Sequence, residues 1–117
     1  MSSRLAFESL SGSEEFKKIL SGNKIQSKLF TIFYILKDKK DKASNIKVSC
    51  VAAKKLGNAV KRNRMRRRLK MAFRKSIETI GSRFNKNFKY AVFAKSKIYD
   101  EEFAKITDEL TLKLKSI

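Results

Sequence analysis

The sequence contains no histidine, no proline and no tryptophan, and it has a single cysteine, Cys50, in 117 residues. Without histidine, the chain lacks the most common general base and can form neither a His-containing catalytic triad nor a common zinc site. One cysteine excludes an intramolecular disulfide, and its apolar, strand-like surroundings predict a buried thiol in a reducing compartment rather than a reactive one. With no proline, repeats or low-complexity tracts, we expect one domain over residues 1–117.

Long apolar segments are also missing. No stretch approaches the roughly 18 apolar residues of a membrane span, and the N-terminal residues lack the apolar core of a signal peptide. We therefore expect a cytoplasmic protein without a membrane partner. Residues 1–10 show no clear period and are expected to form a mobile N-terminal arm.

Acidic residues are scarce, with 11 Asp and Glu against 29 Lys and Arg, which gives a net charge of +18. The acidic clusters 14–15 and 100–102 fall where helices are expected to begin, so capping is a better explanation for them than acid–base catalysis. Gly57 does not belong to a phosphate-binding GxxxxGK[ST] loop. We therefore identify no catalytic or metal-binding residue, and expect a monomer that binds a polyanion in a salt-dependent manner.

Residues 54–75 concentrate the positive charge, with eleven Lys or Arg and no acid. Like charges one helical turn apart repel each other, so this density favours a polyanionic partner. Apolar residues recur here at intervals of three and four, which predicts an amphipathic helix. They are Met65, Leu69, Ala72, Phe73, Ile77 and Ile80.

The first half of the chain predicts a helix followed by strands. Ser11 and Glu14 form a capping-box pattern for a helix ending at Leu20, where Gly22 and Asn23 would adopt left-handed conformations. Residues 24–36 are rich in β-branched and aromatic types, which favours one long strand or two strands broken near Ser27.

The remaining segments complete an α/β pattern. Residues 37–45 predict a charged turn, and 46–53 predict the hairpin partner of the preceding strand. Residues 88–95 form another expected strand, and a final apolar stripe from Phe103 to Ile117 predicts a helix capped by Asp100. The fold class is therefore α/β (α+β): a two-layer sandwich with a small mixed sheet and the element order α-β-β-(β)-α-β-α.

The basic segment resembles the "RNR" signature of the bacterial ribonuclease P protein subunit. The resemblance rests on the segments 54–55 and 57–60, the run Arg62-Asn63-Arg64-Met65-Arg66-Arg67, and the following Leu69 and Lys70. Arg68 stands where that family commonly has an apolar residue, and Lys70 where it has Arg. The resemblance implies a left-handed βαβ crossover, which the general right-handed rule would not predict.

By the same resemblance, the partners are the ribonuclease P RNA subunit, in a one-to-one complex, and precursor tRNA. The RNA subunit with its Mg²⁺ ions would remove the 5′ leader, and the protein, holding no cofactor of its own, would assist. The RNA-binding candidates are Lys54, Lys55, Arg62, Asn63, Arg64, Arg66, Arg67, Lys70 and Arg74. Two questions stay open: either the helix starts irregularly or Arg62 has a specific structural or RNA partner, and Asn63 either contacts a nucleotide or caps the helix.

The resemblance also implies a cleft for the single-stranded leader between the first helix and the sheet, where aromatic rings stack on bases. Its candidates are Phe16, Leu20, Thr31, Phe33, Val51 and Lys95. Leu20 stands where the family often has an aromatic residue. Periodicity alone would place Phe16, Leu20 and Phe33 in an ordinary core.

Two other functions fit a basic chain. A general RNA-binding or ribosome-associated structural protein would bind unrelated RNAs equally well. A cationic helix on a membrane surface fits less well, because tryptophan is absent and the apolar stripe is needed by the sheet.

Overall fold

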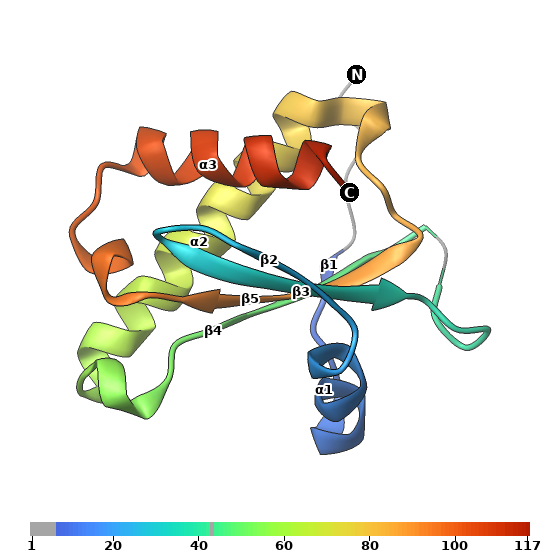
Figure 1. Cartoon of the computed structure of the whole chain (residues 1–117), viewed down its shortest axis with the longest axis horizontal. Helices are drawn as coiled ribbons and strands as arrows, with labels where there is room; N and C mark the ends of the chain where they lie inside the picture. The colour runs from blue at the N-terminus through green and yellow to red at the C-terminus, as the bar shows by residue number, and fades with distance from the viewer. Residues whose placement is uncertain (1–6, 43) are drawn as a thin grey trace.

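Five strands form one mixed sheet in the computed structural model, which describes residues 7–42 and 44–117 (Figure 1). The spatial order is β1-β4-β5-β3-β2, with parallel pairing of β1 with β4 and of β4 with β5, and antiparallel pairing elsewhere. The strands are β1 (Phe7–Glu8), β2 (Asn23–Gln26), β3 (Phe30–Leu36), β4 (Ile46–Val51) and β5 (Phe88–Ala94). The predicted mixed α/β class is confirmed, and the extended segment 24–36 is two strands.

Helices cover the two faces of the sheet unequally. Helices α2 (Ala59–Ile80) and α3 (Phe103–Lys115) lie on one face, and α1 (Gly12–Leu20) lies on the other (Figure 1). Short 3-10 turns are η1 (Lys54–Leu56), η2 (Gly81–Arg83) and η3 (Ser96–Tyr99). Because α2 links the parallel neighbours β4 and β5, it is the helix of a βαβ crossover, whose left-handedness stays a prediction. In the described part of the chain, no helix is long and apolar enough to cross a membrane.

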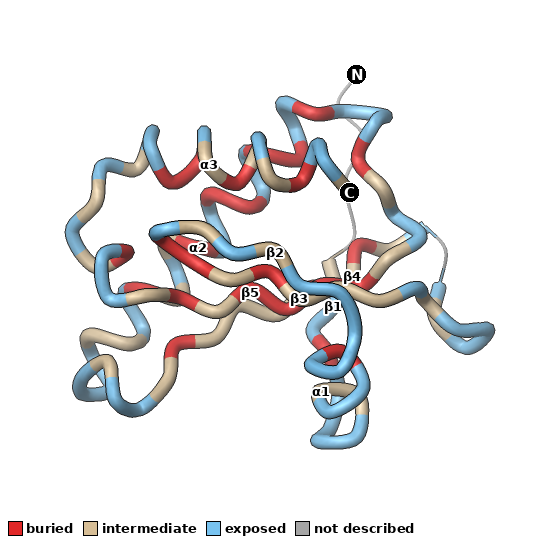
Figure 2. The backbone as a smooth tube through the Cα atoms, viewed as in Figure 1, coloured by how far each residue is buried: buried red, intermediate tan, exposed pale blue. Residues whose placement is uncertain are grey.

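The apolar stripe of α2 is buried as predicted, and it packs between the sheet and α3 (Figure 2). Phe73 contacts Phe84 and Tyr90 edge to face, with ring centroids 6.0 and 5.9 Å apart. Fully burying one such side chain contributes about 1.5–3 kcal/mol. This packing holds the basic face of α2 in a fixed orientation.

The predicted β3–β4 hairpin is wrong, because β5 lies between the two strands. Ala91 of β5 pairs with Phe33 of β3 on one side and with Ser49 of β4 on the other. The α2 crossover returns the chain to the sheet beside β4, and β5 fills the position that a hairpin partner would take. The 37–45 segment is therefore a wide connection between non-adjacent strands.

The ends of α1 also differ from the prediction. The backbone N–H of Ser11 donates to Glu15 Oε1 at 2.6 Å, so Glu15 rather than Glu14 satisfies this helix end. Gly22 does not adopt a positive φ. It is required for another reason: a Cβ there would collide with Cγ2 of Ile35.

Asp100 does not cap α3, because the helix begins after Glu102. Residues 7–10 of the predicted N-terminal arm are attached to the sheet. Residues 1–6 lie outside the described residues, but Phe7 and Glu8 pair with β4, and buried Leu10 donates its N–H to Ser49 Oγ at 2.9 Å.

Four charged side chains fix α1 against the sheet. Lys47 Nζ lies 2.8 Å from Glu15 Oε2 and 2.9 Å from Asp41 Oδ1. Lys89 Nζ lies 2.9 Å from the same Glu15 oxygen and 3.0 Å from Asp41 Oδ2. The side chains of Lys89 and Asp41 are each 2% exposed. This ion-pair quartet joins α1, the 37–45 connection, β4 and β5.

The quartet keeps all four groups charged. Burial alone would raise the pKa of Glu15, but hydrogen bonds from Lys47 and Lys89 outweigh it and lower that pKa to about 2. Burial likewise opposes the shift at Asp41, whose pKa the two lysines hold far below its usual range. The pKa values of both lysines rise, against the effect of burial, because the carboxylates favour their charged forms.

We predict that Glu15→Gln lowers the free energy of unfolding by about 2 kcal/mol at pH 7, because the buried ammonium of Lys89 and the partly buried ammonium of Lys47 lose a shared carboxylate. A lowered carboxyl pKa stabilises the fold above its ordinary value of 4.5, and this stabilisation is lost as pH falls toward about 2. The difference between wild type and variant should therefore shrink across that range. Urea unfolding at several pH values measures it.

The matched control is Glu14→Gln at the exposed neighbouring position, which should change stability by less than about 0.5 kcal/mol. Equal losses in the two variants, or a difference that does not change with pH, would contradict the role given to Glu15.

Candidate nucleic-acid interface

The segment before α2 orients the first turn of that helix toward solvent. Gly57 has φ 145°, in the left-handed region that favours glycine, and the side chain of Asn58 accepts a hydrogen bond from the N–H of Lys61 at 2.9 Å. Asn58 is therefore the cap, which removes capping as a role for Asn63. Lys54 and Lys55 lie exposed in η1, next to the positive end of the helix dipole.

Three arginines of α2 direct their Nε atoms at backbone carbonyl groups. Arg62 donates to Gly57 at 3.1 Å, Arg64 to Tyr99 at 2.9 Å and Arg68 to Ile98 at 2.9 Å. Arg62 therefore has a structural partner, and its contact with RNA stays a prediction. Arg68 Nη2 also donates to the carbonyl of Glu101, so this residue ties α2 to the segment that precedes α3.

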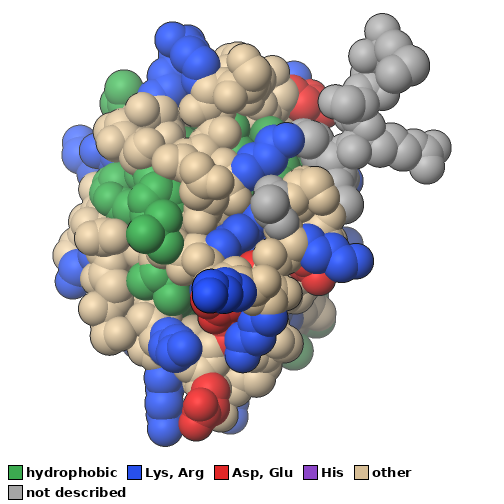
Figure 3. Space-filling view, turned by 90° about the vertical axis from the view of Figure 1, so that its right-hand side faces the viewer, with side chains coloured by type: hydrophobic (Ala, Val, Ile, Leu, Met, Phe, Trp, Pro, Cys, Tyr) green, Lys and Arg blue, Asp and Glu red, His purple; other side chains and the backbone are tan. Residues whose placement is uncertain are grey.

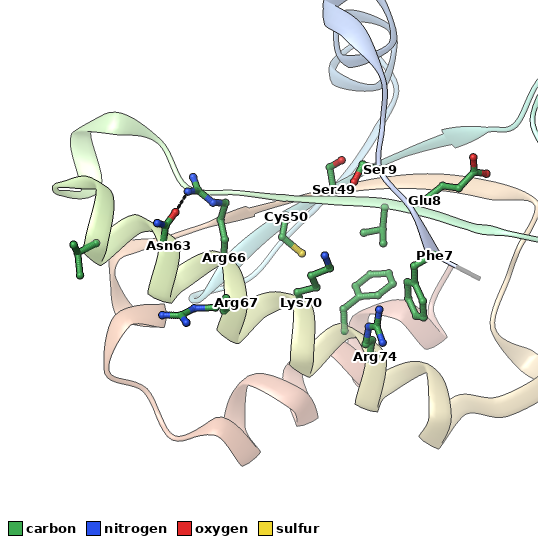
Figure 4. Close-up of a pocket in the computed structure, with 13 residues that line it drawn as sticks. Phe7, Glu8, Ser9, Ser49, Cys50, Asn63, Arg66, Arg67, Lys70 and Arg74 are labelled. Carbon is green, nitrogen blue, oxygen red and sulfur yellow. Dashed lines mark hydrogen bonds between the residues drawn. The ribbon is translucent and has the colours of Figure 1, made fainter. Parts of the chain in front are cut away.

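A pocket of about 580 Å³ opens between α2, β4 and β1 (Figure 4). Apolar side chains of Val48, Cys50 and Phe73 line it from the sheet and the helix, and Phe7 lines it from β1. β1 pairs only with Ile46 and Lys47 of β4. The pocket therefore lies beside the part of β4 that β1 does not pair with.

Five of the nine predicted RNA-binding residues line this pocket. They are Asn63, Arg66, Arg67, Lys70 and Arg74. Asn63 Oδ1 accepts a hydrogen bond from Arg66 Nη2, and the guanidinium of Arg74 lies 4.5 Å from the ring centre of Phe7. Among the described lining residues, Glu8 is the one acid, and its carboxylate already accepts from Asn45 Nδ2 at 2.8 Å.

Cys50 of β4 lies in the pocket next to Lys70 (Figure 4). Burial raises the pKa of its thiol to about 12, and the nearby Lys70 ammonium only partly opposes this. The side chain is therefore a neutral thiol at physiological pH. It forms part of the apolar floor rather than a nucleophile.

Positive side chains spread over the molecule beyond this pocket. Among the charged side chains on the face shown in Figure 3, Lys and Arg predominate over Asp and Glu. The pairing of Glu15 and Asp41 with Lys47 and Lys89 withdraws acids from the surface. The exposed cations are left largely uncompensated.

Most of the predicted leader-cleft residues meet on the sheet face that carries α1. Thr31, Phe93 and Val51 lie opposite one another on β3, β5 and β4. Two residues further along β3, Phe33 pairs with Ala91 of β5. Phe16 of α1 packs against the same cluster as Phe33. Phe16, Thr31, Phe33 and Val51 are partly buried, and Leu20 at the end of α1 is 44% exposed.

Two residues differ from the leader-cleft prediction: Lys95 was predicted but has a partner within the fold, whereas Phe93 was not predicted but lies among the cleft residues. Lys95 Nζ donates to the carbonyl of Ser27 at 2.6 Å and so secures the β2–β3 turn. Phe93, which the prediction omitted, contacts Phe33 edge to face, with ring centroids 5.4 Å apart, and lies between Thr31 and Val51 in the sheet. Alternation along residues 88–95 was the signal that could have identified it.

These features define a small, strongly basic α/β protein with a cationic helix pocket at one edge of its sheet and partly exposed aromatic residues on the α1 face. Residues 6–117 match the family described as Ribonuclease P, and the chain belongs to this family. It is accordingly a protein subunit of a tRNA-processing ribonucleoprotein, accessory to an endoribonuclease whose catalytic role lies with the RNA. The identification suggested by the RNR motif is confirmed.

Individual relatives agree with the family assignment. The chain is 31% identical over 102 residues to the ribonuclease P protein component of Carboxydothermus hydrogenoformans, covering 86% of this chain and 83% of that one. The Thermotoga maritima ribonuclease P protein has a similar fold, with a TM-score of 0.74, 23% identity, and coverage of 94% and 97% of the two chains. The Staphylococcus aureus protein gives a TM-score of 0.66 at 22% identity, covering 90% and 92%.

We predict that Arg68→Ala lowers the free energy of unfolding by about 1.5 kcal/mol, because two backbone carbonyls lose a charged donor. Arg67→Ala, one residue away and exposed, removes the same charge and should change stability by less than about 0.5 kcal/mol. Urea unfolding of both variants at one pH tests this. Similar losses in the two variants would show that Arg68 has no special structural role.

Proposed function

We propose that the pocket side of α2 docks the ribonuclease P RNA through its phosphates. The observation that carries this proposal is the gathering of Arg66, Arg67, Lys70 and Arg74 around one pocket whose only acid, among the described lining residues, is already hydrogen-bonded. Arg binds phosphate through two parallel N–H donors, whereas Lys70 supplies a point charge. Exposed Lys54 and Lys55 extend the same strip ahead of the helix.

We propose a different site for the leader of precursor tRNA: the sheet face that carries α1. Phe16, Phe33 and Phe93 offer aromatic surface there, and single-stranded bases gain about 1–3 kcal/mol each by stacking on such rings. The pocket on α2 includes Ser49 of β4, which pairs with Ala91 of β5, a residue of the α1 face. The two sites therefore adjoin at the β4 edge, which would let one protein contact both RNAs.

We further propose a one-to-one complex in the cytoplasm, with Mg²⁺ held by the RNA. The net charge of +18 opposes self-association and favours attachment to a single large polyanion. In reconstitution, the protein should lower the Mg²⁺ concentration needed for leader removal by its RNA. Failure to do so, or equal competition from unrelated RNA, would favour a general RNA-binding role instead.

We predict that Arg67→Ala flattens the salt dependence of RNA binding. Each lost phosphate contact changes the slope of log K against log salt by about 0.9 on duplex or about 0.7 on single strands. The control is Lys105→Ala on α3, which removes one exposed charge paired with Glu102 and should leave the slope unchanged. Titrations at several salt concentrations measure both, and equal slopes for Arg67→Ala and wild type would exclude that contact.

We predict that Leu20→Phe tightens binding of leader-bearing precursor tRNA by about fivefold, corresponding to about 1 kcal/mol of added stacking. Leu20 is exposed at the end of α1, so an aromatic ring fits there without disturbing the core. Affinity for mature tRNA, which has no leader, is the control and should not change. Equal tightening for both RNAs would place the leader elsewhere.

A further inference from the structure

Two cationic side chains from the first turns of α2 lie over the ring of Tyr99, at the end of η3. Lys61 Nζ lies 4.9 Å from the centre of its ring, and the guanidinium carbon of Arg64 lies 5.1 Å from it. Both distances fall within the roughly 6 Å range of cation–π attraction. The ring is partly buried against the core, so it forms a fixed support for the two charges.

A hydrogen bond also fixes the direction of Arg64. Its Nε donates to the carbonyl oxygen of Tyr99 at 2.9 Å. A guanidinium group is planar and has five N–H donors, so the Nε bond leaves the donors of Nη1 and Nη2 for another partner. Arg64 is exposed. The Arg64 side chain is therefore held through Nε, and its Nη1 and Nη2 donors remain available to a partner.

The carbonyl that Arg64 uses lies in a segment that is itself held in place. Arg68 donates to the carbonyls of Ile98 and Glu101, on either side of Tyr99. Ile98 is buried in the main core. The Tyr99 carbonyl therefore cannot move independently of α2, and the geometry around Arg64 is fixed by the fold.

We propose that Tyr99 is a positioning residue that holds Arg64 and Lys61 as a two-cation site for RNA backbone phosphates, separate from the pocket lined by Arg66 and Arg74. This inference rests on the proposed docking of α2 to RNA and adds a second point of contact. Its physical basis is preorganisation: ordering one long side chain on binding costs about 0.5–1.5 kcal/mol, equivalent to about twofold to tenfold in affinity. Tyr99 removes part of that cost without adding charge.

The test compares RNA affinities of wild type, Tyr99→Leu and Tyr99→Phe. Leucine keeps apolar bulk but removes the ring, and should weaken binding threefold to tenfold while leaving the salt slope unchanged, because the phosphate contacts remain. Phenylalanine keeps the ring and should bind as wild type does. An unchanged affinity in Tyr99→Leu overturns the positioning role.

Arg64 variants separate positioning from direct contact. Arg64→Lys keeps the charge at an exposed position, loses the fork and the Nε bond, and should weaken binding to a similar degree. In a Lys61→Ala, Arg64→Ala background, Tyr99→Leu should have no further effect on affinity. A further loss there would mean that the ring touches RNA itself, which overturns the proposal.

Arg67→Ala distinguishes this inference from the proposed function. If Arg67→Ala flattens the salt slope while Tyr99→Leu and Arg64→Lys bind as wild type does, the α2 interface stands and the Tyr99 site fails. If none of the three variants changes RNA binding, the α2 interface itself fails. Unfolding midpoints, measured alongside, ensure that each titration is done on folded protein.

Discussion

The scarcity of acid governs this structure, and the ion-pair quartet shows how that acid is used. Burying the Lys89 ammonium would be costly without a partner, and Glu15 and Asp41 supply partners to it and to Lys47 together. Two of the eleven acids thereby stabilise the attachment of α1 while neutralising only lysines beneath it. The cations of α2 keep their charge for an external partner.

Backbone carbonyls solve a second problem, that of orienting arginines without cancelling their charge. A carboxylate partner would fix an arginine and also neutralise it, whereas a carbonyl oxygen accepts a hydrogen bond and carries no net charge. Arg62, Arg64 and Arg68 all use this type of partner. The helix therefore keeps its positive field while several of its long side chains are held in defined positions, which reduces the entropy lost when they bind.

Local patterns predicted the features that depend on neighbours in the chain. The period of α2 identified its buried stripe because a helix that packs on a sheet must repeat every three to four residues. The RNR motif identified the family and five pocket residues. Strand order was missed because nothing local in residues 46–53 shows that β5, some forty residues later, takes the neighbouring position. The role of Glu15 was missed for the same reason, since its partners Lys47 and Lys89 lie 32 and 74 residues away in the sequence.

One of the two departures from the family motif, Arg68, is explained by these non-local contacts. An apolar residue at position 68 would pack against the segment before α3, and Arg68 instead reaches past it to two carbonyls. That bond fixes η3, and η3 supplies the carbonyl and the ring that meet Arg64. Arg68 therefore influences the position of Arg64, an arginine of the signature one helical turn earlier. In this chain, the position of a signature arginine therefore depends on a contact made by another residue of the same helix, one turn away.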